Sequence, residues 1–227
     1  MHAATRPIVF RDRLDAARRL AERLQAYAGQ NPLVLAIPRG AVPMAQCIAQ
    51  ALQGDLDLVL VRKLGAPYQP EYAIGSVDES GWTYLSPHAA ATGADAHYIA
   101  TEKRRQLQLI HQRRAQYTPI RPPLEVARRI VIVVDDGLAT GATMRAAALA
   151  LRAMRPGRII VAVPVGSAEA CRRLENEADE VICLATPDPF HGVGAWYDDF
   201  EQTTDEEVVQ VLAQAEAARA SRTTDRA

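Results

Sequence analysis

Residues 130–143 read IVIVVDDGLATGAT, and this stretch carries the strongest structural signal in the chain. Its first five residues are all β-branched and apolar, which is typical of a parallel strand buried on both faces. Asp135 and Asp136 follow at the end of that strand, where open α/β sheets bind ligands. The small residues 139–143 then lead into a helix, and their amides and threonine hydroxyls favour an anion. The stretch therefore predicts a site for a ligand with vicinal hydroxyls and a phosphate, such as a phosphorylated ribose.

Other interpretations of the stretch are weaker. An ordinary strand–helix turn, with Asp136 capping the helix and Thr140 in the turn, would need the strand, the acid pair and the threonine loop to coincide by accident. A Walker A loop is excluded because no Gly-Lys-Ser/Thr follows. A dinucleotide fingerprint is excluded because no G-x-G-x-x-G follows a strand.

The layout resembles the phosphoribosyl-pyrophosphate (PRPP) motif of the type I phosphoribosyltransferases. That motif is a short apolar strand, two acidic residues, a few variable residues and Thr-Gly-x-Thr, and each part is present here in order. The resemblance implies that Asp135 and Asp136 hold the ribose 2′ and 3′ hydroxyls. It implies that the 5′-phosphate lies in the loop formed by Ala139, Thr140, Gly141, Ala142 and Thr143.

The rest of the chain predicts an α/β fold, a doubly wound, mainly parallel sheet flanked by helices. Besides 130–134, strands are expected at 33–37, 56–61, 159–165 and 180–184, and helices at 12–28, 41–52, 96–117, 143–154 and 169–176. Residues 67–84 are expected to form short antiparallel strands or a mobile loop, and residues 119–123 a linker. We expect a single domain over 1–227, with its core at about 29–187, a hood from 1–28 and 188–212, and a disordered tail at 213–227.

The composition limits the possible classes of protein. The 227 residues are 48% hydrophobic and 23% charged, as in ordinary globular proteins. A net charge of −1 gives no general attraction to nucleic acid or membranes, so the basic helix at 96–117 is interpreted as a solvated face. The apolar runs are too short to span a bilayer. Three cysteines without metal-ligand spacing indicate reduced thiols, and we expect a cytoplasmic protein.

A second candidate anion site follows the strand at 33–37. Arg39 and Gly40 come directly after it and before a helix, which adds a fixed positive charge to a helix start. A simple helix-entry turn is the alternative. In the phosphoribosyltransferases this loop binds pyrophosphate and often holds a strained non-proline cis peptide, which Gly40 would tolerate.

Arg62 and Lys63 follow the strand expected at 56–61, so we expect them on the ligand-binding rim of the sheet. The family resemblance implies that a basic residue here reaches the pyrophosphate, whereas a pair of surface charges is the alternative. Residues 64–82 match the position of the family's flexible loop, which closes over the reacting centre and excludes water.

Residues 188–200 are aromatic and acidic in a chain with only 5% aromatic residues. Phe190, His191 and Trp196 could stack on a base, or they could pack a hood onto the core. By resemblance to purine-salvage members, Val193 and Gly194 lie where the base stacks, and Asp198 contacts Mg²⁺.

The chain also looks like a group of bacterial phosphoribosyltransferase-like proteins whose acceptor is undefined. It departs from hypoxanthine-guanine members, which carry an acidic residue before the Thr-Gly and a lysine on the following strand. This chain has Ala139 at the first position, and Gly166 and Ser167 in the second region. A 6-oxopurine acceptor is therefore not expected, while an adenine-like base or another amine remains open.

We thus expect an enzyme that transfers the phosphoribosyl group of PRPP to a nitrogen acceptor and releases pyrophosphate, with Mg²⁺ as cofactor. Asp135, Asp136, Lys63 and Arg39 are the expected catalytic residues; the others at the substrate are Gly40, Arg62, Trp196 and residues 139–143. We expect a homodimer that binds PRPP and a small acceptor, and neither nucleic acid nor membrane. A regulatory module that senses PRPP or a nucleotide without turnover is the alternative.

Overall fold

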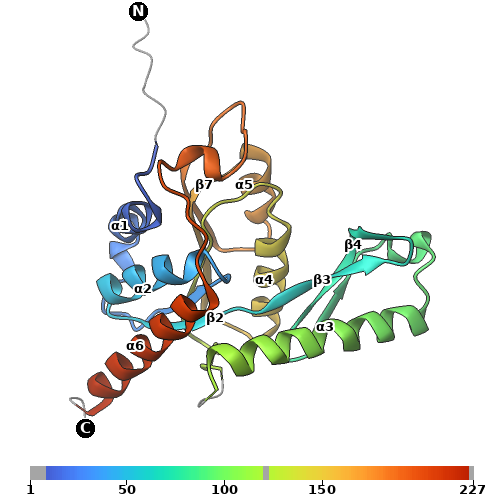
Figure 1. Ribbon diagram of the computed structural model, residues 1–227, viewed down its shortest axis with the longest axis horizontal. Helices are drawn as coiled ribbons and strands as arrows, with labels where there is room; N and C mark the ends of the chain where they lie inside the picture. Colours follow the sequence, from blue (N-terminus) through green and yellow to red (C-terminus); the bar gives the residue numbers. More distant parts are fainter. Residues whose placement is uncertain (1–8, 120–122, 225–227) are drawn as a thin grey trace, which may run out of the picture.

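A computed structural model of the chain describes residues 9–119 and 123–224. In this part of the chain the larger sheet has the strand order β2-β1-β6-β7-β8, and every neighbouring pair is parallel. The strands are β1 (Leu33–Ala36), β2 (Asp55–Leu58), β6 (Ile130–Val134), β7 (Arg158–Val165) and β8 (Glu180–Ala185). The predicted α/β fold with a mainly parallel sheet is confirmed (Figure 1).

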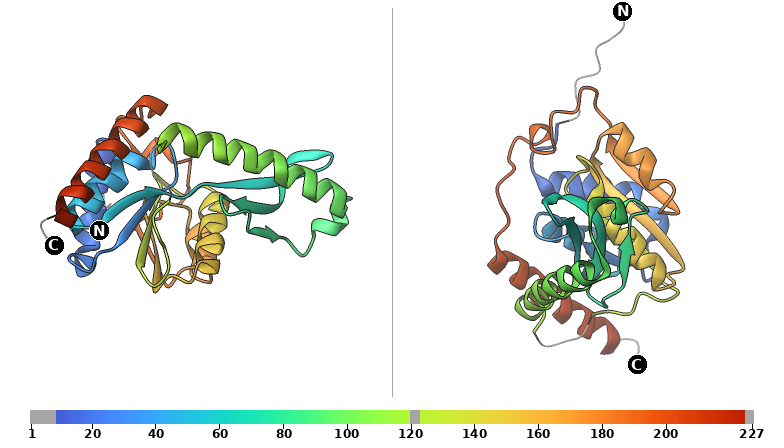
Figure 2. Two further views of the ribbon diagram at one scale, coloured as in Figure 1. Left: turned by 90° about the horizontal axis from the view of Figure 1, so that it is seen from below. Right: turned by 90° about the vertical axis from the view of Figure 1, so that its right-hand side faces the viewer.

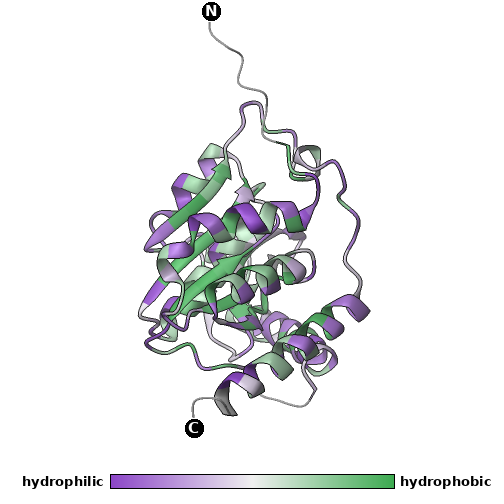
Figure 3. Ribbon diagram, turned by 90° about the vertical axis from the view of Figure 1, so that its left-hand side faces the viewer, coloured by the Kyte–Doolittle hydropathy of each residue, from purple (hydrophilic) through white to green (hydrophobic). Residues whose placement is uncertain are grey.

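The strands of this sheet supply two hydrophobic layers, one on each face. On β6, Ile132 and Val134 belong to the layer beneath α1 (Arg13–Arg23) and α2 (Ala41–Leu52). Val131 and Val133 belong to the opposite layer, which packs against α4 (Ala142–Ala153) and α5 (Ala168–Leu174). Because both faces are covered, the strand has no polar side, and Figure 3 shows the apolar strands enclosed by helices with polar outer faces.

An arm projects from the larger sheet, formed by a second, antiparallel sheet and the long helix α3 (Ala96–Tyr117). Its strands are β3 (Val61–Ala66), β4 (Gln69–Asp78) and β5 (Thr83–Leu85), followed by the 3₁₀ turn η2 (Ala89–Thr92). Figures 1 and 2 show α3 running along this sheet, away from the core. The antiparallel strands predicted within residues 67–84 are confirmed.

The arm corrects one prediction. The strand expected at 56–61 divides in two, because β2 pairs with β1 only as far as Leu58 and the chain then enters the arm at Val61. Arg62 and Lys63 therefore lie inside β3 and not on the rim of the parallel sheet. Three buried side chains join the arm to the core: Leu64, Ile74 and Val77. Their burial stabilises the early departure of the chain from the larger sheet.

The C-terminal helix α6 (Asp205–Thr224) corrects a second prediction, because residues 213–224 are helical where a disordered tail was expected. Val208 and Leu212 are buried in the core layer that contains α2, and the Arg222 Nη2 atom lies 2.8 Å from the Asp55 carboxylate on β2. Residues 225–227 of that tail and residues 120–122 of the expected linker lie outside the described residues.

Short elements complete the first and last parts of the chain. The expected helix at 12–28 is α1 followed by the 3₁₀ turn η1 (Gln25–Tyr27), and Asp12 caps α1 by accepting from the Asp15 amide at 2.7 Å. The turn η3 (Gly194–Trp196) lies in the segment before α6. Among the described helices, none combines the length and apolar character that crossing a membrane requires.

Candidate active site

The acid pair follows β6, at the carboxyl edge of the parallel sheet. The Asp136 amide donates to the Asp135 Oδ1 atom at 2.9 Å, which ties the Asp135 carboxylate to the backbone. Burial, together with the neighbouring Asp136 carboxylate, raises the pKa of Asp135 to about 8. In the free protein Asp135 is therefore largely protonated at neutral pH.

Asp136 is held by a residue far away in the sequence. The Nε and Nη2 atoms of Arg13 donate to a single oxygen of Asp136, Oδ2, at 3.0 and 2.8 Å. The Tyr197 hydroxyl donates to the Asp136 carbonyl oxygen at 2.7 Å. Burial and the Asp136 charge raise the pKa of this hydroxyl far above its usual range, so it stays protonated as a donor.

The loop from Ala139 to Thr143 turns sharply from the acid pair into α4. Gly141 has φ of 72°, a left-handed conformation that a residue with a side chain rarely adopts, and it caps the helix. Ala142 and Thr143 form the first turn of α4, where helix amides have no partner within the helix. The Ser167 hydroxyl donates to the Ala139 carbonyl oxygen at 3.0 Å and fixes the base of the loop. The loop is thus a candidate anion cradle, and its phosphate-binding role stays a prediction.

The loop after β1 lies beside the acid pair. It contains a cis peptide bond between Pro38 and Arg39, one residue before the position at which Gly40 was expected to tolerate it. Gly40 itself has an ordinary helical backbone. Glycine is required here by lack of space, because an added Cβ atom would lie 2.3 Å from the Asp136 Oδ2 atom. The Arg39 guanidinium is half-buried and lies 3.7 Å from the Asp205 carboxylate at the start of α6.

Arg62 and Lys63 are successive residues of β3, and their side chains have different partners. The Arg62 Nε atom donates to Gln106 on α3, and burial and the nearby Arg113 lower the pKa of Arg62. The Lys63 ammonium lies 2.6 Å from the exposed Glu71 carboxylate. Both residues line a cavity of about 620 Å³ that is also lined by residues 140–143. The arm therefore brings both predicted cations to a cavity shared with the loop at 139–143, although from a different strand than expected.

The aromatic segment gives a mixed result. Phe190 and Trp196 pack against the core layer that contains α1, as the alternative interpretation expected, and the Trp196 Nε1 atom is buried with no partner among the described residues. Asp198 is exposed, and its amide donates to the Phe10 carbonyl oxygen at 2.8 Å. The described residues contain no cluster of three metal-ligating side chains. The base-stacking and Mg²⁺ roles remain predictions.

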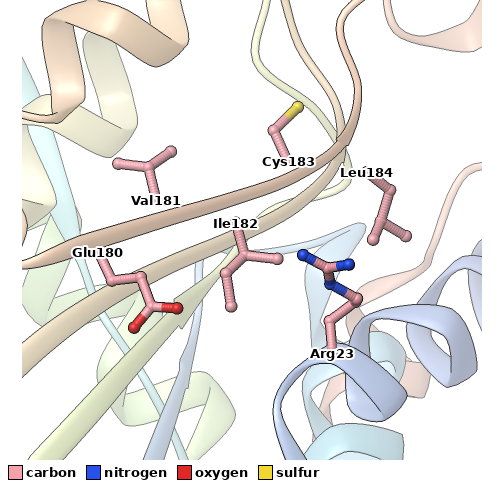
Figure 4. Close-up of a pocket in the computed structure, with 6 residues that line it drawn as sticks. All are labelled: Arg23, Glu180, Val181, Ile182, Cys183 and Leu184. Atoms are coloured by element: carbon pink, nitrogen blue, oxygen red, sulfur yellow. The ribbon is translucent and has the colours of Figure 1, made fainter.

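A pocket elsewhere lies along the edge strand β8. It has a volume of about 300 Å³ and is lined by Arg23 and residues 180–184, with the Arg23 side chain reaching toward Ile182 and Leu184 (Figure 4). Of the described residues that line it, none is a predicted site residue. The acid pair and the phosphate loop therefore remain the centre of the candidate site.

Sequence reasoning missed Arg13 and Tyr197, the two side chains that hold Asp136. Arg13 is one of several arginines in the first helix, and it lies 123 residues from Asp136 in the chain, so the sequence carried no signal that would single it out.

Comparisons with known proteins agree with this geometry. A family model described as the phosphoribosyl transferase domain matches residues 11–199. A relative from Mycobacterium tuberculosis (strain ATCC 25618 / H37Rv), named "Putative phosphoribosyl transferase Rv0571c", is 42% identical over 208 residues, which are 91% of this chain and 47% of the relative. The chain thus spans about half the length of the curated relatives it matches.

A solved structure shows the same fold at higher similarity. The crystal structure of TT1426 from Thermus thermophilus is 45% identical and superposes with a TM-score of 0.83, covering 91% of this chain and 98% of that chain. The family model extends from the start of α1, through the acid pair and the phosphate loop, to the segment before α6. The chain therefore belongs to the phosphoribosyl transferase domain family.

Proposed function

We propose that this chain transfers the phosphoribosyl group of PRPP to a nitrogen acceptor and releases pyrophosphate. One observation carries the proposal. Asp135 Oδ2 and Asp136 Oδ1 have no hydrogen-bond partner among the described residues, and they lie next to the anion cradle at 139–143. Two such oxygens beside a phosphate site fit the vicinal hydroxyls and the 5′-phosphate of a phosphoribosyl group.

In the proposed reaction the acceptor nitrogen attacks C1 of the ribose as the bond from C1 to pyrophosphate breaks. Positive charge develops on the sugar, so the protein's main contributions are alignment of the sugar and stabilisation of the leaving group. Asp135 and Asp136 would hold the ribose, and residues 139–143 the phosphate. Arg39 and Lys63 would offset the charge that develops on pyrophosphate, with Arg62 beside Lys63 in the same cavity.

Mg²⁺ fits this site as a cofactor carried with PRPP. The ion needs only one or two carboxylates because it keeps several waters and binds substrate phosphates. Asp198 is exposed, and no partner of its carboxylate is found among the described residues, so it can serve as such a ligand. When bound, Mg²⁺ would supply positive charge to the pyrophosphate oxygens.

The acceptor is proposed to be an adenine-like base or another amine rather than a 6-oxopurine. The Ser167 hydroxyl is already used twice, since it donates to the Ala139 carbonyl and accepts from the Ala170 amide at 3.2 Å. Ala139 offers no proton acceptor in its side chain. Phe190, His191 and Trp196, in the proposed hood, would flank the acceptor.

The test is a panel of bases and amines with PRPP and Mg²⁺, scored by pyrophosphate release. Turnover with a panel member supports transfer. Tight PRPP binding with no turnover across the panel would instead favour a sensing module, in which the same cradle binds ligand and signals to a partner.

A further inference from the structure

We propose that Arg13 is a positioning residue, which orients Asp136 so that one carboxylate oxygen faces the sugar. The inference rests on the proposed function, since it assigns Asp136 to the ribose. It adds a residue from the first helix, which neither the motif nor the pyrophosphate loop contains.

The contact is directional. Arg13 places two donors, Nε and Nη2, on the Oδ2 atom of Asp136, and Oδ1 is left without a described partner. Both side chains are mostly buried, with 13% and 19% of their surfaces exposed. Two charged donors on one oxygen make a strong charge-assisted contact, which holds that oxygen against Arg13. The free oxygen is then held in one direction before any ligand arrives.

Arg13 is itself held from a second segment. Its guanidinium carbon lies 3.8 Å from the centre of the Phe200 ring, and its Nη1 atom donates to the Glu201 carbonyl oxygen at 2.5 Å. Phe200 also packs on Tyr197, whose hydroxyl reaches the backbone of Asp136. The segment before α6 therefore contacts both Arg13 and Asp136 and stabilises their positions.

The loop after β1, which is the proposed pyrophosphate loop, packs against the Arg13–Asp136 pair. A Cβ atom at Gly40 would lie 3.0 Å from the Arg13 Nε atom as well as 2.3 Å from the Asp136 Oδ2 atom. The ion pair thus fills the space that a side chain at Gly40 would need. A shift of Arg13 would move Asp136 against the loop that carries Arg39. The Arg13–Asp136 pair is therefore packed between the proposed ribose end and the proposed pyrophosphate end of the site.

The experiment is a double-mutant cycle between Arg13→Gln and Asp136→Asn, measured by calorimetry with ribose 5-phosphate and, separately, with inorganic pyrophosphate. We expect Arg13→Gln alone to weaken ribose 5-phosphate binding by roughly tenfold or more, and pyrophosphate binding by much less. In the Asp136→Asn background, Arg13→Gln should cause no further loss. We expect Arg13→Lys to recover part of the affinity, because it restores the charge but not the two-donor geometry.

Arg19→Gln is the matched control. Arg19 lies on the same helix, pairs with Asp15 at 2.7 Å and covers the Phe10 ring, but it does not touch the acid pair. Its loss should leave both affinities unchanged. Should Arg13→Gln not fold, the same cycle is run with Arg13→Lys.

Additive losses in the cycle, or equal losses for the two ligands, would show that Arg13 only supports the fold and would overturn the inference. If the parent binds PRPP and Arg13→Gln binds ribose 5-phosphate equally well, the inference alone fails. If the parent binds neither PRPP nor ribose 5-phosphate, the proposed function fails first and the role of Arg13 fails with it.

Discussion

Asp135 and Asp136 are neighbours in the chain, but their surroundings differ. Asp136 faces Arg13, whereas Asp135 is half-buried at the end of β6, and desolvation and the Asp136 carboxylate raise its pKa to about 8. The pair therefore combines a carboxyl whose protonation is favoured with one that is held by Arg13. Such a combination can donate one hydrogen bond and accept others, which suits a sugar with two adjacent hydroxyls.

The raised pKa of Asp135 predicts how stability depends on pH. The carboxyl ionises near its ordinary value of 3.8 in the unfolded chain and near 8 in the folded protein. The folded state therefore binds more protons between these values, and the free energy of unfolding should fall as pH rises from about 4 to about 8.

Asp135→Asn tests this directly, because the amide cannot ionise and its oxygen can still accept from the Asp136 amide. We expect the variant to be more stable than the parent above pH 8, by an amount of the order of a few kcal/mol, and about equally stable near pH 4. Denaturant unfolding across this pH range measures the difference. A constant difference between variant and parent would assign the carboxyl an ordinary pKa.

At this scale, local patterns were predictable and long-range contacts were not. Residues 130–143 are contiguous, so the apolar run, the acid pair and the small loop could each be interpreted from neighbours alone. The Arg13–Asp136 pair and the packing of Asp136 against Gly40 depend on the folded chain bringing distant segments together. Sequence motifs, which describe residue types at fixed spacing, cannot predict contacts between segments so far apart in the chain.

Among the helices and strands, the arm determines the positions of the two predicted cations, Arg62 and Lys63. β2 leaves the parallel sheet after Leu58, and β3 then carries Arg62 and Lys63 to the cavity that residues 140–143 also line. The sequence showed a continuous apolar run across this point, so its division between two sheets could not be foreseen. The cations reach the phosphate loop only because the arm packs along α4.

Replacing a cationic side chain at the proposed pyrophosphate end should weaken the binding of pyrophosphate more than the binding of ribose 5-phosphate. We expect Arg39→Ala and Lys63→Ala each to weaken inorganic pyrophosphate binding by roughly tenfold, and ribose 5-phosphate binding by less, because charge-assisted contacts to pyrophosphate are lost. Lys103→Ala, on α3, is the control for Lys63 and should leave both affinities unchanged. Equal losses for the two ligands in the Arg39 and Lys63 variants would mean that these residues act through the fold.

The helix α6 gives a second prediction at this scale. Leu212 is 2% exposed and packs in the layer that contains α2, so Leu212→Ala should lower the free energy of unfolding by about 2–5 kcal/mol. Gln210→Ala, an exposed position on the same helix, should change it by less than about 0.5 kcal/mol. Equal stabilities for parent and Leu212→Ala would show that α6 does not pack on the core at this position.

In the molecule as a whole, the parallel sheet brings the acid pair, the loop at 139–143 and the loop after β1 to one edge. β1 and β6 are adjacent and in register, so the loops that follow them leave the sheet side by side. The alternation of strands and helices was enough to predict this layout. The hood was predicted as a region, but its contact with Arg13 through Phe200 and Glu201 exists only in the folded chain.

The choice of acceptor also depends on distant parts of the chain, since the acceptor would lie between the sheet edge and the proposed hood. Guanine and hypoxanthine should be poor substrates, because Ala139 cannot take a proton and the Ser167 hydroxyl is already engaged. Steady-state kinetics with guanine should give kcat/KM well below ~10⁴ M⁻¹s⁻¹, the lower end of the range for ordinary enzymes. A value at or above that level would show that the acceptor end recognises 6-oxopurines by other groups.

We propose that the acid pair after β6 binds the ribose of PRPP. Calorimetric titration of PRPP with Mg²⁺ into the parent and into Asp136→Asn tests it most directly. We expect the parent to bind and the variant to bind roughly tenfold more weakly or worse, because a carboxylate held by Arg13 and facing the sugar is lost. Equal affinities of the parent and Asp136→Asn for PRPP would show that Asp136 does not bind the ribose.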